Sequence, residues 1–80
     1  MASDVEARVI KCFSLVFPEL AADEIETASR QTLRRWDSLA SVTLFAVLEE
    51  EFNIKLVPED FVILSSFNDI REHVRFRVGG

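Results

Sequence analysis

The first apolar pattern along the chain has helical spacing. It consists of Val5, Val9, Cys12, Phe13, Val16 and Phe17. Apolar residues that recur every three or four positions place one buried face on a helix. Ser3 and Glu6 have the spacing of a capping box at its start. Pro18 ends the helix, because the residue before a proline disfavours helical geometry. Cys12 lies on the buried stripe, so we interpret it as a core residue and not as a reactive thiol.

Residues 18–36 have no sustained periodicity and predict a long connection. Leu20, Ile25 and Leu33 are expected to fix this connection to the core. A loop of this length is uncommon in a compact domain unless it has a function. A short helical turn near Ala21 to Glu26 would shorten it.

A second main helix is predicted from Ser38 to Phe52, because this stretch lacks Gly and Pro and follows Asp37, a good N-cap. Its core-facing stripe comprises Leu44, Phe45, Leu48 and Phe52. A second apolar stripe on a different side comprises Leu39, Val42 and Ala46, flanked by Thr43 and Glu50. A helix in so small a domain needs only one buried face. The second stripe is therefore either additional core or a docking surface.

The last part of the chain predicts a short helix followed by a longer one. Pro58-Glu59-Asp60 suits a first helical turn. Ser65 or Ser66 is expected to cap the last helix, before a frayed end at Gly79-Gly80. The apolar positions of the two helices are Phe61, Leu64, Phe67, Ile70 and Val74, with Val78 as a further candidate.

Strands over residues 61–64 and 74–78 would have no partner strand, which argues against a sheet. The sequence therefore predicts an all-α bundle of three main helices plus one short helix, in a single domain over residues 1–80.

Composition narrows the protein class. Hydrophobic residues make up 49% of the chain, which predicts a compact core. One Cys and one His exclude an internal disulfide and a zinc site built from this chain alone. The start of the chain, 1–4, has neither a basic stretch nor an apolar run and predicts no signal peptide. The longest apolar run, 44–48, is too short to span a bilayer. We expect a cytoplasmic monomer without membrane insertion.

The acidic charge is concentrated in the middle of the chain. The formal charge is −5 for the whole chain, and residues 37–60 alone carry −5, against −1 for residues 1–36 and +1 for residues 61–80. Such a surface repels nucleic acid and attracts basic protein surfaces. The run Glu49–Glu51 also has a simpler interpretation, as a solvated helix end.

The sequence does not indicate an enzyme. A Ser–His–Asp hydrolase would need His73, the one His, close to Ser38 and a cleft. His73 instead falls late in the last helix, between Arg71 and Arg75. The glycines are the last two residues, so there is no Gly-rich phosphate loop, and the acids lack the alternating pattern of a calcium loop.

Ser38 is the strongest candidate for attachment chemistry. A hydroxyl at a helix start lies near free backbone amides and the positive end of the helix dipole, which stabilise a phosphate. Asp37 suffices as the cap, so the Ser38 hydroxyl is spare. These observations leave open whether Ser38 is an attachment site or only a first-turn residue.

Asp37-Ser38-Leu39 resembles the Asp-Ser-Leu motif of acyl carrier proteins, in which the serine bears a 4′-phosphopantetheine arm. The stretch from Trp36 to Phe52 is similar to the second helix of that family in length, phase and acidic ending. Residues 58–60 and 64–67 are similar to its short third helix and the start of its fourth. The resemblance covers nearly the whole chain, most firmly residues 36–74.

The resemblance implies an acyl-carrier-like four-helix bundle without activity of its own. A phosphopantetheinyl transferase would move the arm from coenzyme A onto Ser38, and the arm would present acyl thioesters to transferring, ligase or synthase enzymes with basic docking patches. It implies cofactor contacts at Asp37 and Leu39, and the closeness of Arg35 to Ser38 adds Arg35 to these candidates. Implied partner-binding residues are Leu39, Val42, Thr43, Ala46 and Glu50. Implied acyl-chain pocket residues are Phe45, Leu48, Leu64, Phe67 and Ile70.

Departures from the family pattern indicate a specialised carrier. Arg35 stands where the family usually has glycine, and Trp36 where a small residue is common. Ala40 and Thr43 stand where carriers of fatty acid synthesis have acids. We therefore expect a dedicated carrier in a particular lipid or secondary-metabolite pathway, with Arg34 or Arg35 contacting the phosphodiester of the arm. The alternatives are an aminoacyl or peptidyl carrier, an unmodified helical interaction module and a small hydrolase.

Overall fold

The chain forms five helices over residues 4–78, the range that the computed structural model describes. The helices are α1 (Asp4–Val16), α2 (Ala22–Glu26), α3 (Ser38–Phe52), α4 (Pro58–Ile63) and α5 (Phe67–Arg77). Within this range there is no β-strand, only an isolated antiparallel bridge between Ser29 and Ser66. The all-α prediction is confirmed, with three long helices and the predicted short helix α4. The predicted cap Ser3 and the predicted frayed end Gly79-Gly80 lie outside the described residues.

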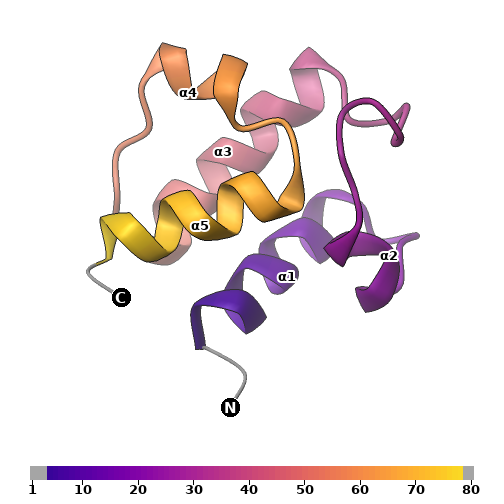
Figure 1. Cartoon of the computed structure of the whole chain (residues 1–80), viewed down its shortest axis with the longest axis horizontal. Helices are drawn as coiled ribbons and strands as arrows, with labels where there is room; N and C mark the ends of the chain where they lie inside the picture. The colour runs from indigo at the N-terminus through magenta and orange to yellow at the C-terminus, as the bar shows by residue number, and fades with distance from the viewer. Residues whose placement is uncertain (1–3, 79–80) are drawn as a thin grey trace.

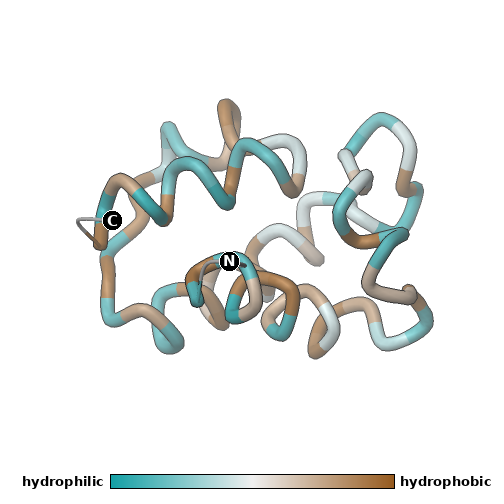
Figure 2. The backbone as a smooth tube through the Cα atoms, turned by 60° about the horizontal axis from the view of Figure 1, so that its bottom comes forward, coloured by the Kyte–Doolittle hydropathy of each residue, from teal (hydrophilic) through white to brown (hydrophobic). Residues whose placement is uncertain are grey.

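The three long helices enclose the core. Helix α1 packs against both α3 and α5, and the short helices α2 and α4 lie at opposite ends of the molecule (Figure 1). Apolar and polar positions alternate along the chain trace (Figure 2), as amphipathic helices require. The buried core comprises Val9, Cys12, Phe13, Phe17, Ile25, Ala28, Trp36, Leu44, Phe45, Leu48, Phe52, Leu64, Phe67, Ile70 and Val74.

Phe13 is at the centre of an aromatic cluster. Its ring centroid lies 5.4 Å from those of both Trp36 and Phe67, in edge-to-face geometry in each case. Phe17, just beyond the end of α1, lies 6.3 Å from Phe13 and is fully buried. Edge-to-face aromatic pairs add to the stabilisation that burial alone provides. The cluster therefore joins α1 to α5 and to Trp36, which lies just before α3.

The connection between α1 and α3 is more ordered than a loop. Helix α2 occupies the stretch where a short turn was considered, and the Glu24 carboxylate accepts a hydrogen bond from the Ala21 amide at 2.7 Å. Ile25 is fully buried, and Leu20 and Leu33 pack partly buried against the core, as predicted. These anchors hold the long connection on the surface of the bundle.

Local capping explains where the last two helices begin. Pro58 is in the first turn of α4, and the Asp60 carboxylate accepts a hydrogen bond from the Val57 amide at 2.9 Å. Ser66, one of the two predicted caps, accepts a hydrogen bond from the Asp69 amide at the start of α5. Val78 is exposed and does not join the core, because α5 ends one residue before it.

No helix within residues 4–78 has both the length and the apolar character needed to cross a membrane.

Candidate functional site

Ser38 is the first residue of α3 and its side chain is exposed. The Asp37 carboxylate caps the helix by accepting the Ala40 amide at 2.9 Å. Within the described part of the chain, the Ser38 hydroxyl forms no hydrogen bond, as expected if Asp37 is the cap. The first intrahelical bond runs from the Ser41 amide to the Asp37 carbonyl, so the Ser38 and Leu39 amides precede it. An unshared hydroxyl beside such amides suits the attachment of a phosphate.

Trp36 fixes the position of this helix start. Its side chain is 2% exposed, and its indole Nε1–H donates a hydrogen bond to Ser41 Oγ at 2.9 Å. Ser41 is itself buried on α3. Neither the burial of Trp36 nor a role for Ser41 was predicted from the sequence. A Trp before a helix with a Ser five residues later is the sequence signal for this contact, but only the packing reveals it.

The two arginines before Trp36 have different surroundings. Arg35 Nη1 lies 2.7 Å from Glu19 Oε2. This ion pair joins the segment just before α3 to the segment just after α1. Arg34 is exposed, and no ion pair or hydrogen bond to its side chain is formed among the described residues. A phosphate beside Ser38 would compete with Glu19 for Arg35, whereas Arg34 is available without such competition.

The second apolar stripe of α3 lies outside the core. Leu39 is 76% exposed and Val42 54% exposed, and Thr43, Ala46 and Glu50 are exposed as well. Of the two interpretations left open for the stripe, additional core is therefore wrong. Because this face of α3 carries few charged side chains, it is a candidate docking surface.

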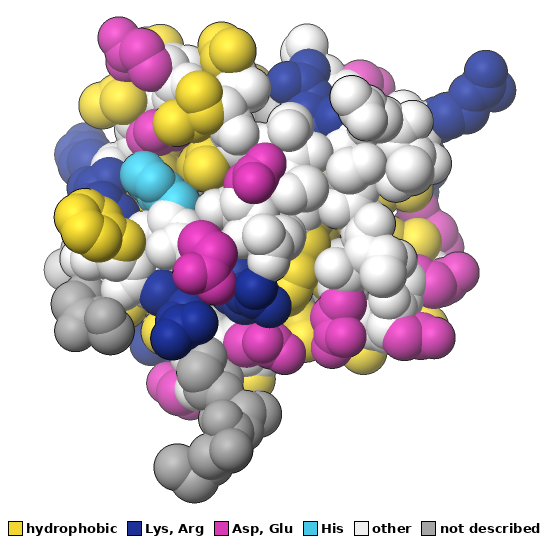
Figure 3. All heavy atoms as spheres, viewed as in Figure 1, with side chains coloured by type: hydrophobic (Ala, Val, Ile, Leu, Met, Phe, Trp, Pro, Cys, Tyr) yellow, Lys and Arg dark blue, Asp and Glu magenta, His cyan; other side chains and the backbone are white. Residues whose placement is uncertain are grey.

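Helix α4 adds exposed apolar side chains that its sequence pattern does not assign to a surface. Val62 and Ile63 are both largely exposed, next to Phe61 and Leu64, which pack inward. Hydrophobic side chains gather over α4 on the face shown in Figure 3. A six-residue helix buries one side only, so four consecutive apolar residues leave two of them in solvent.

The predicted acyl-chain pocket residues come together in the core. Phe45, Leu48, Leu64, Phe67 and Ile70 are each at most 5% exposed. Phe45 also stacks on the half-buried ring of Phe61, with ring centroids 4.3 Å apart. None of these five residues lines the surface hollows described next. Their role as a pocket therefore stays a prediction, and it requires the packed side chains to separate.

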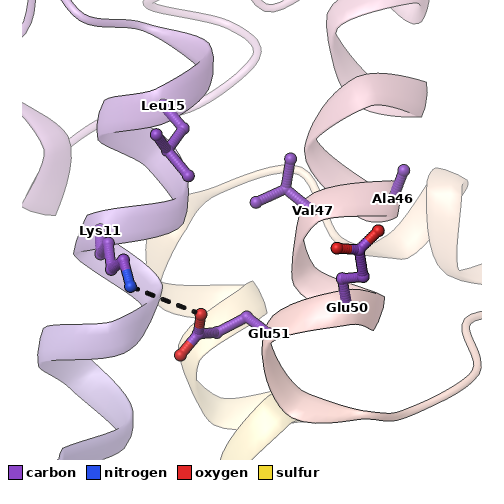
Figure 4. Close-up of a pocket in the computed structure, with 6 residues that line it drawn as sticks. All are labelled: Lys11, Leu15, Ala46, Val47, Glu50 and Glu51. Atoms are coloured by element: carbon purple, nitrogen blue, oxygen red, sulfur yellow. Dashed lines mark ion pairs between the residues drawn. The ribbon is translucent and has the colours of Figure 1, made fainter.

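Two surface hollows lie between α1 and α3 and were not anticipated from the sequence. One, of about 310 Å³, is lined at the Ser38 end by Arg35, Asp37 and Leu39. The other, of about 320 Å³, is lined near the far end of α3 by Lys11, Ala46, Val47, Glu50 and Glu51 (Figure 4). Both are also lined by Leu15 of α1.

Two of the three glutamates at the end of α3 form contacts within the molecule. Glu49 accepts a hydrogen bond from the Leu56 amide at 2.8 Å, and Glu51 pairs with Arg8 at 2.8 Å and with Lys11 at 3.8 Å. The hydrogen bond from Arg8 lowers the pKa of the Glu51 carboxyl and raises that of the guanidinium. Among the three glutamates, Glu50 alone is exposed to solvent, whereas Glu49 and Glu51 are half-buried. Both interpretations of the run, a solvated end and a basic-partner face, therefore apply mainly to Glu50.

His73 and Cys12, the other side chains with reactive groups, are packed against neighbouring residues of the fold. His73 Nε2 on α5 is 3.9 Å from Asp60 Oδ2 on α4, and Asp60 is 5% exposed. Cys12 is fully buried, and loss of solvation raises the pKa of its thiol to about 11. No cluster of His, Cys, Asp and Glu that could hold a metal is found within residues 4–78.

Comparisons with protein-family models, with curated proteins and with solved structures find no match to this chain.

Proposed function

We propose that this chain is an acyl carrier protein whose Ser38 bears a 4′-phosphopantetheine arm. The observation that carries the proposal is the exposed Ser38 hydroxyl, free of hydrogen bonds among the described residues because Asp37 caps α3 in its place. The resemblance of residues 36–74 to carrier proteins supplies the identity of the group.

The residues around Ser38 suit its modification by another enzyme. The hydroxyl is accessible for attack, within a phosphopantetheinyl transferase, on the phosphorus of coenzyme A that bears the pantetheine. The new P–O bond would replace the pyrophosphate P–O bond, adenosine 3′,5′-bisphosphate would leave, and the transferase would take up the serine proton. The capped first turn of α3 and the buried Trp36 hold the hydroxyl in place. Arg34 is available to contact the phosphodiester. When bound, the arm supplies a terminal thiol that holds acyl groups as thioesters.

Helix α3 is the proposed docking element. Leu39, Val42 and Ala46 offer apolar contact, while Glu50 attracts basic residues of a partner enzyme. Ala40 and Thr43 in place of acids support a dedicated pathway over general fatty acid synthesis. A cytoplasmic location is part of the proposal because the modification depends on coenzyme A and its transferase, and we propose in addition that the protein is a monomer.

A test of the proposal is incubation with a promiscuous phosphopantetheinyl transferase, Mg²⁺ and coenzyme A, followed by intact mass measurement. The wild type should gain the mass of one phosphopantetheine, and Ser38→Ala should gain none. Ser14→Ala, at another exposed serine, is the matched control and should be modified like the wild type. A wild type that stays unmodified, beside a known carrier that is modified, would refute the proposal.

An unmodified helical interaction module is the second candidate, favoured by the exposed apolar side chains Leu39, Val42, Val62 and Ile63. It would account for the docking surface without an arm. An aminoacyl or peptidyl cargo is distinguished by the mass of the thioester isolated from the native source.

A further inference from the structure

The two hollows follow one another along α1 and α3 and share Leu15 in their lining, and we call the pair the α1–α3 groove. It begins at the hollow lined by Asp37 and Leu39, continues past Leu15, and ends at the hollow lined by Lys11 and Glu50. Together the hollows are large enough for a small-molecule ligand, since ligand sites have volumes upwards of roughly 300 Å³. The groove is open to solvent, so its apolar wall residues remain partly uncovered.

The groove follows one face of α3 from its first turn to its last. Leu39, Thr43, Ala46 and Glu50 line it at spacings of four, three and four residues, which share a helical face. From Ser38 to Glu50 the helix rises about 18 Å at 1.5 Å per residue. Ser38 lies between Asp37 and Leu39, both of which line the groove at its beginning.

The walls of the groove are apolar in the middle and charged at both ends. Leu15 of α1 is 65% exposed, and in Figure 4 Leu15 and Val47 point toward one another across the gap between the helices. At the Ser38 end Arg35 pairs with Glu19, and at the far end Lys11 pairs with Glu51. An occupant with an apolar middle matches these walls, and a phosphate at the Ser38 end would compete with Glu19 for Arg35.

Thr43 supplies a polar atom within the apolar part. Its hydroxyl donates to the Leu39 carbonyl at 3.2 Å, so the lone pairs of Thr43 Oγ1 remain able to accept a hydrogen bond. A backbone-like amide N–H passing along the groove is a suitable donor. An uncharged hydroxyl at this position admits a neutral ligand at less cost of desolvation than a carboxylate would.

We propose that the arm on Ser38 lies along the α1–α3 groove, which places its thiol and cargo at the Lys11–Glu50 end. The inference rests on the proposed function. The arm begins with a phosphodiester and continues through a gem-dimethyl carbon and two amides, so both apolar contact with the groove walls and a hydrogen bond to Thr43 Oγ1 can form along its length. Entry into the core would instead require Phe45 to separate from Phe61, whose rings stack at 4.3 Å, whereas the groove is already open.

The test compares ¹⁵N-labelled apo and arm-bearing protein by NMR, after mass measurement has shown that the arm is attached. The amide signals of Leu15, Thr43 and Val47 should shift on attachment, with nuclear Overhauser contacts from the arm to the methyl groups of Thr43 and Val47. Leu15→Glu should abolish these contacts and the shifts beyond the first turn of α3. Leu15 is exposed and lies on α1, so this variant is expected to fold and leaves the docking side chains of α3 unchanged.

Val62→Glu is the matched control, because Val62 is a similarly exposed apolar residue on α4 that does not line the groove. It should show the wild-type shifts and contacts.

Ala46→Gln, on the opposite wall, should also reduce the contacts. Agreement between Ala46→Gln and Leu15→Glu would show that the loss comes from the groove and not from a local change of structure around residue 15. Circular dichroism of each variant checks that the helices are retained.

Three outcomes would overturn the inference. Shifts confined to the neighbours of Ser38 would mean that the arm moves freely in solvent. Shifts concentrated at Leu64 and Ile70 would mean that it enters the core. Unchanged contacts in Leu15→Glu would mean that the groove does not hold it. A wild type that gains no mass refutes the proposed function itself, and the mass measurement therefore separates the two failures.

Discussion

Trp36 Nε1 donates a hydrogen bond to Ser41 Oγ at 2.9 Å, and both side chains are buried. The contact joins the last turn of the long connection to the second turn of α3. Because the Trp36 ring also lies edge-to-face with Phe13, the start of α3 is held against α1 by both polar and apolar contacts. The exposed Ser38 thus lies on a well-anchored segment.

Removing the indole donor should destabilise the fold. Trp36→Phe keeps an aromatic ring but leaves Ser41 Oγ buried without its partner, which costs about 1–3 kcal/mol of unfolding free energy. Ser41→Ala should have a cost of similar size, because the indole N–H is then unpaired. Urea unfolding of both variants measures the effects.

The double variant provides the control for this pair. If the hydrogen bond is the cause, Trp36→Phe with Ser41→Ala should cost less than the sum of the single variants, because neither polar group then lacks a partner. Strict additivity would show that the two side chains act independently.

Loss of the cap should weaken α3. Asp37→Ala removes the acceptor of the Ala40 amide and should cost about 0.5–2 kcal/mol. Asp37→Ser, which restores an acceptor, should recover most of that stability. Thermal unfolding measures both, and equal losses in the two variants would mean that the cap contributes nothing specific to hydrogen bonding.

Acid should weaken the contact between α1 and α3. Arg8 lowers the pKa of Glu51 below its ordinary value of 4.5, so the contact stabilises the fold above that pH and is lost as the pH falls through the lowered pKa. Glu51→Gln should therefore be less stable than the wild type at pH 7, with the difference shrinking between about pH 5 and pH 3.

Glu50→Gln is the control for this pH dependence, since Glu50 is exposed and Glu51 is the glutamate that pairs with Arg8. Its stability should follow that of the wild type across the same range. A wild-type advantage over Glu51→Gln that stays constant down to pH 3 would contradict the role given to this carboxylate.

Cys12 should resist alkylation in the folded protein. Its burial raises the pKa to about 11, so only about one thiol in a thousand is ionised at pH 8, and the side chain is also inaccessible. Iodoacetamide should label the urea-unfolded chain readily and the folded apo protein hardly at all. Rapid labelling of Cys12 in the folded protein would contradict its place in the core.

In the arm-bearing protein the same reagent has a second use. The thiol of the arm should then be the group that reacts in the folded state, and peptide mapping separates it from Cys12. Labelling confined to the Ser38 peptide is the expected result.

Several elements could be predicted from the sequence because their causes are local. Periodicity predicts α1 and α3, Pro18 ends the first helix, Asp37 starts the second, and Pro58 starts α4. Capping and backbone restrictions act within a few residues, so they can be recognised in the sequence without knowledge of the fold. The candidate Ser38 and its neighbouring cap Asp37 could likewise be identified from the consecutive residues 37–39.

Only the tertiary structure decided which surfaces meet. The stripe of Leu39 and Val42 is compatible with core or with surface by its sequence, and it is exposed because the core-facing stripe of α3 is the one that Leu44, Phe45 and Leu48 form. Arg8 and Glu51 are 43 residues apart, and no local rule pairs them. The α1–α3 groove also needs side chains from two helices to be side by side. The sequence by itself determined the helices and the candidate serine, whereas the partners of each side chain depended on how the helices pack, because packing joins residues that are distant along the chain.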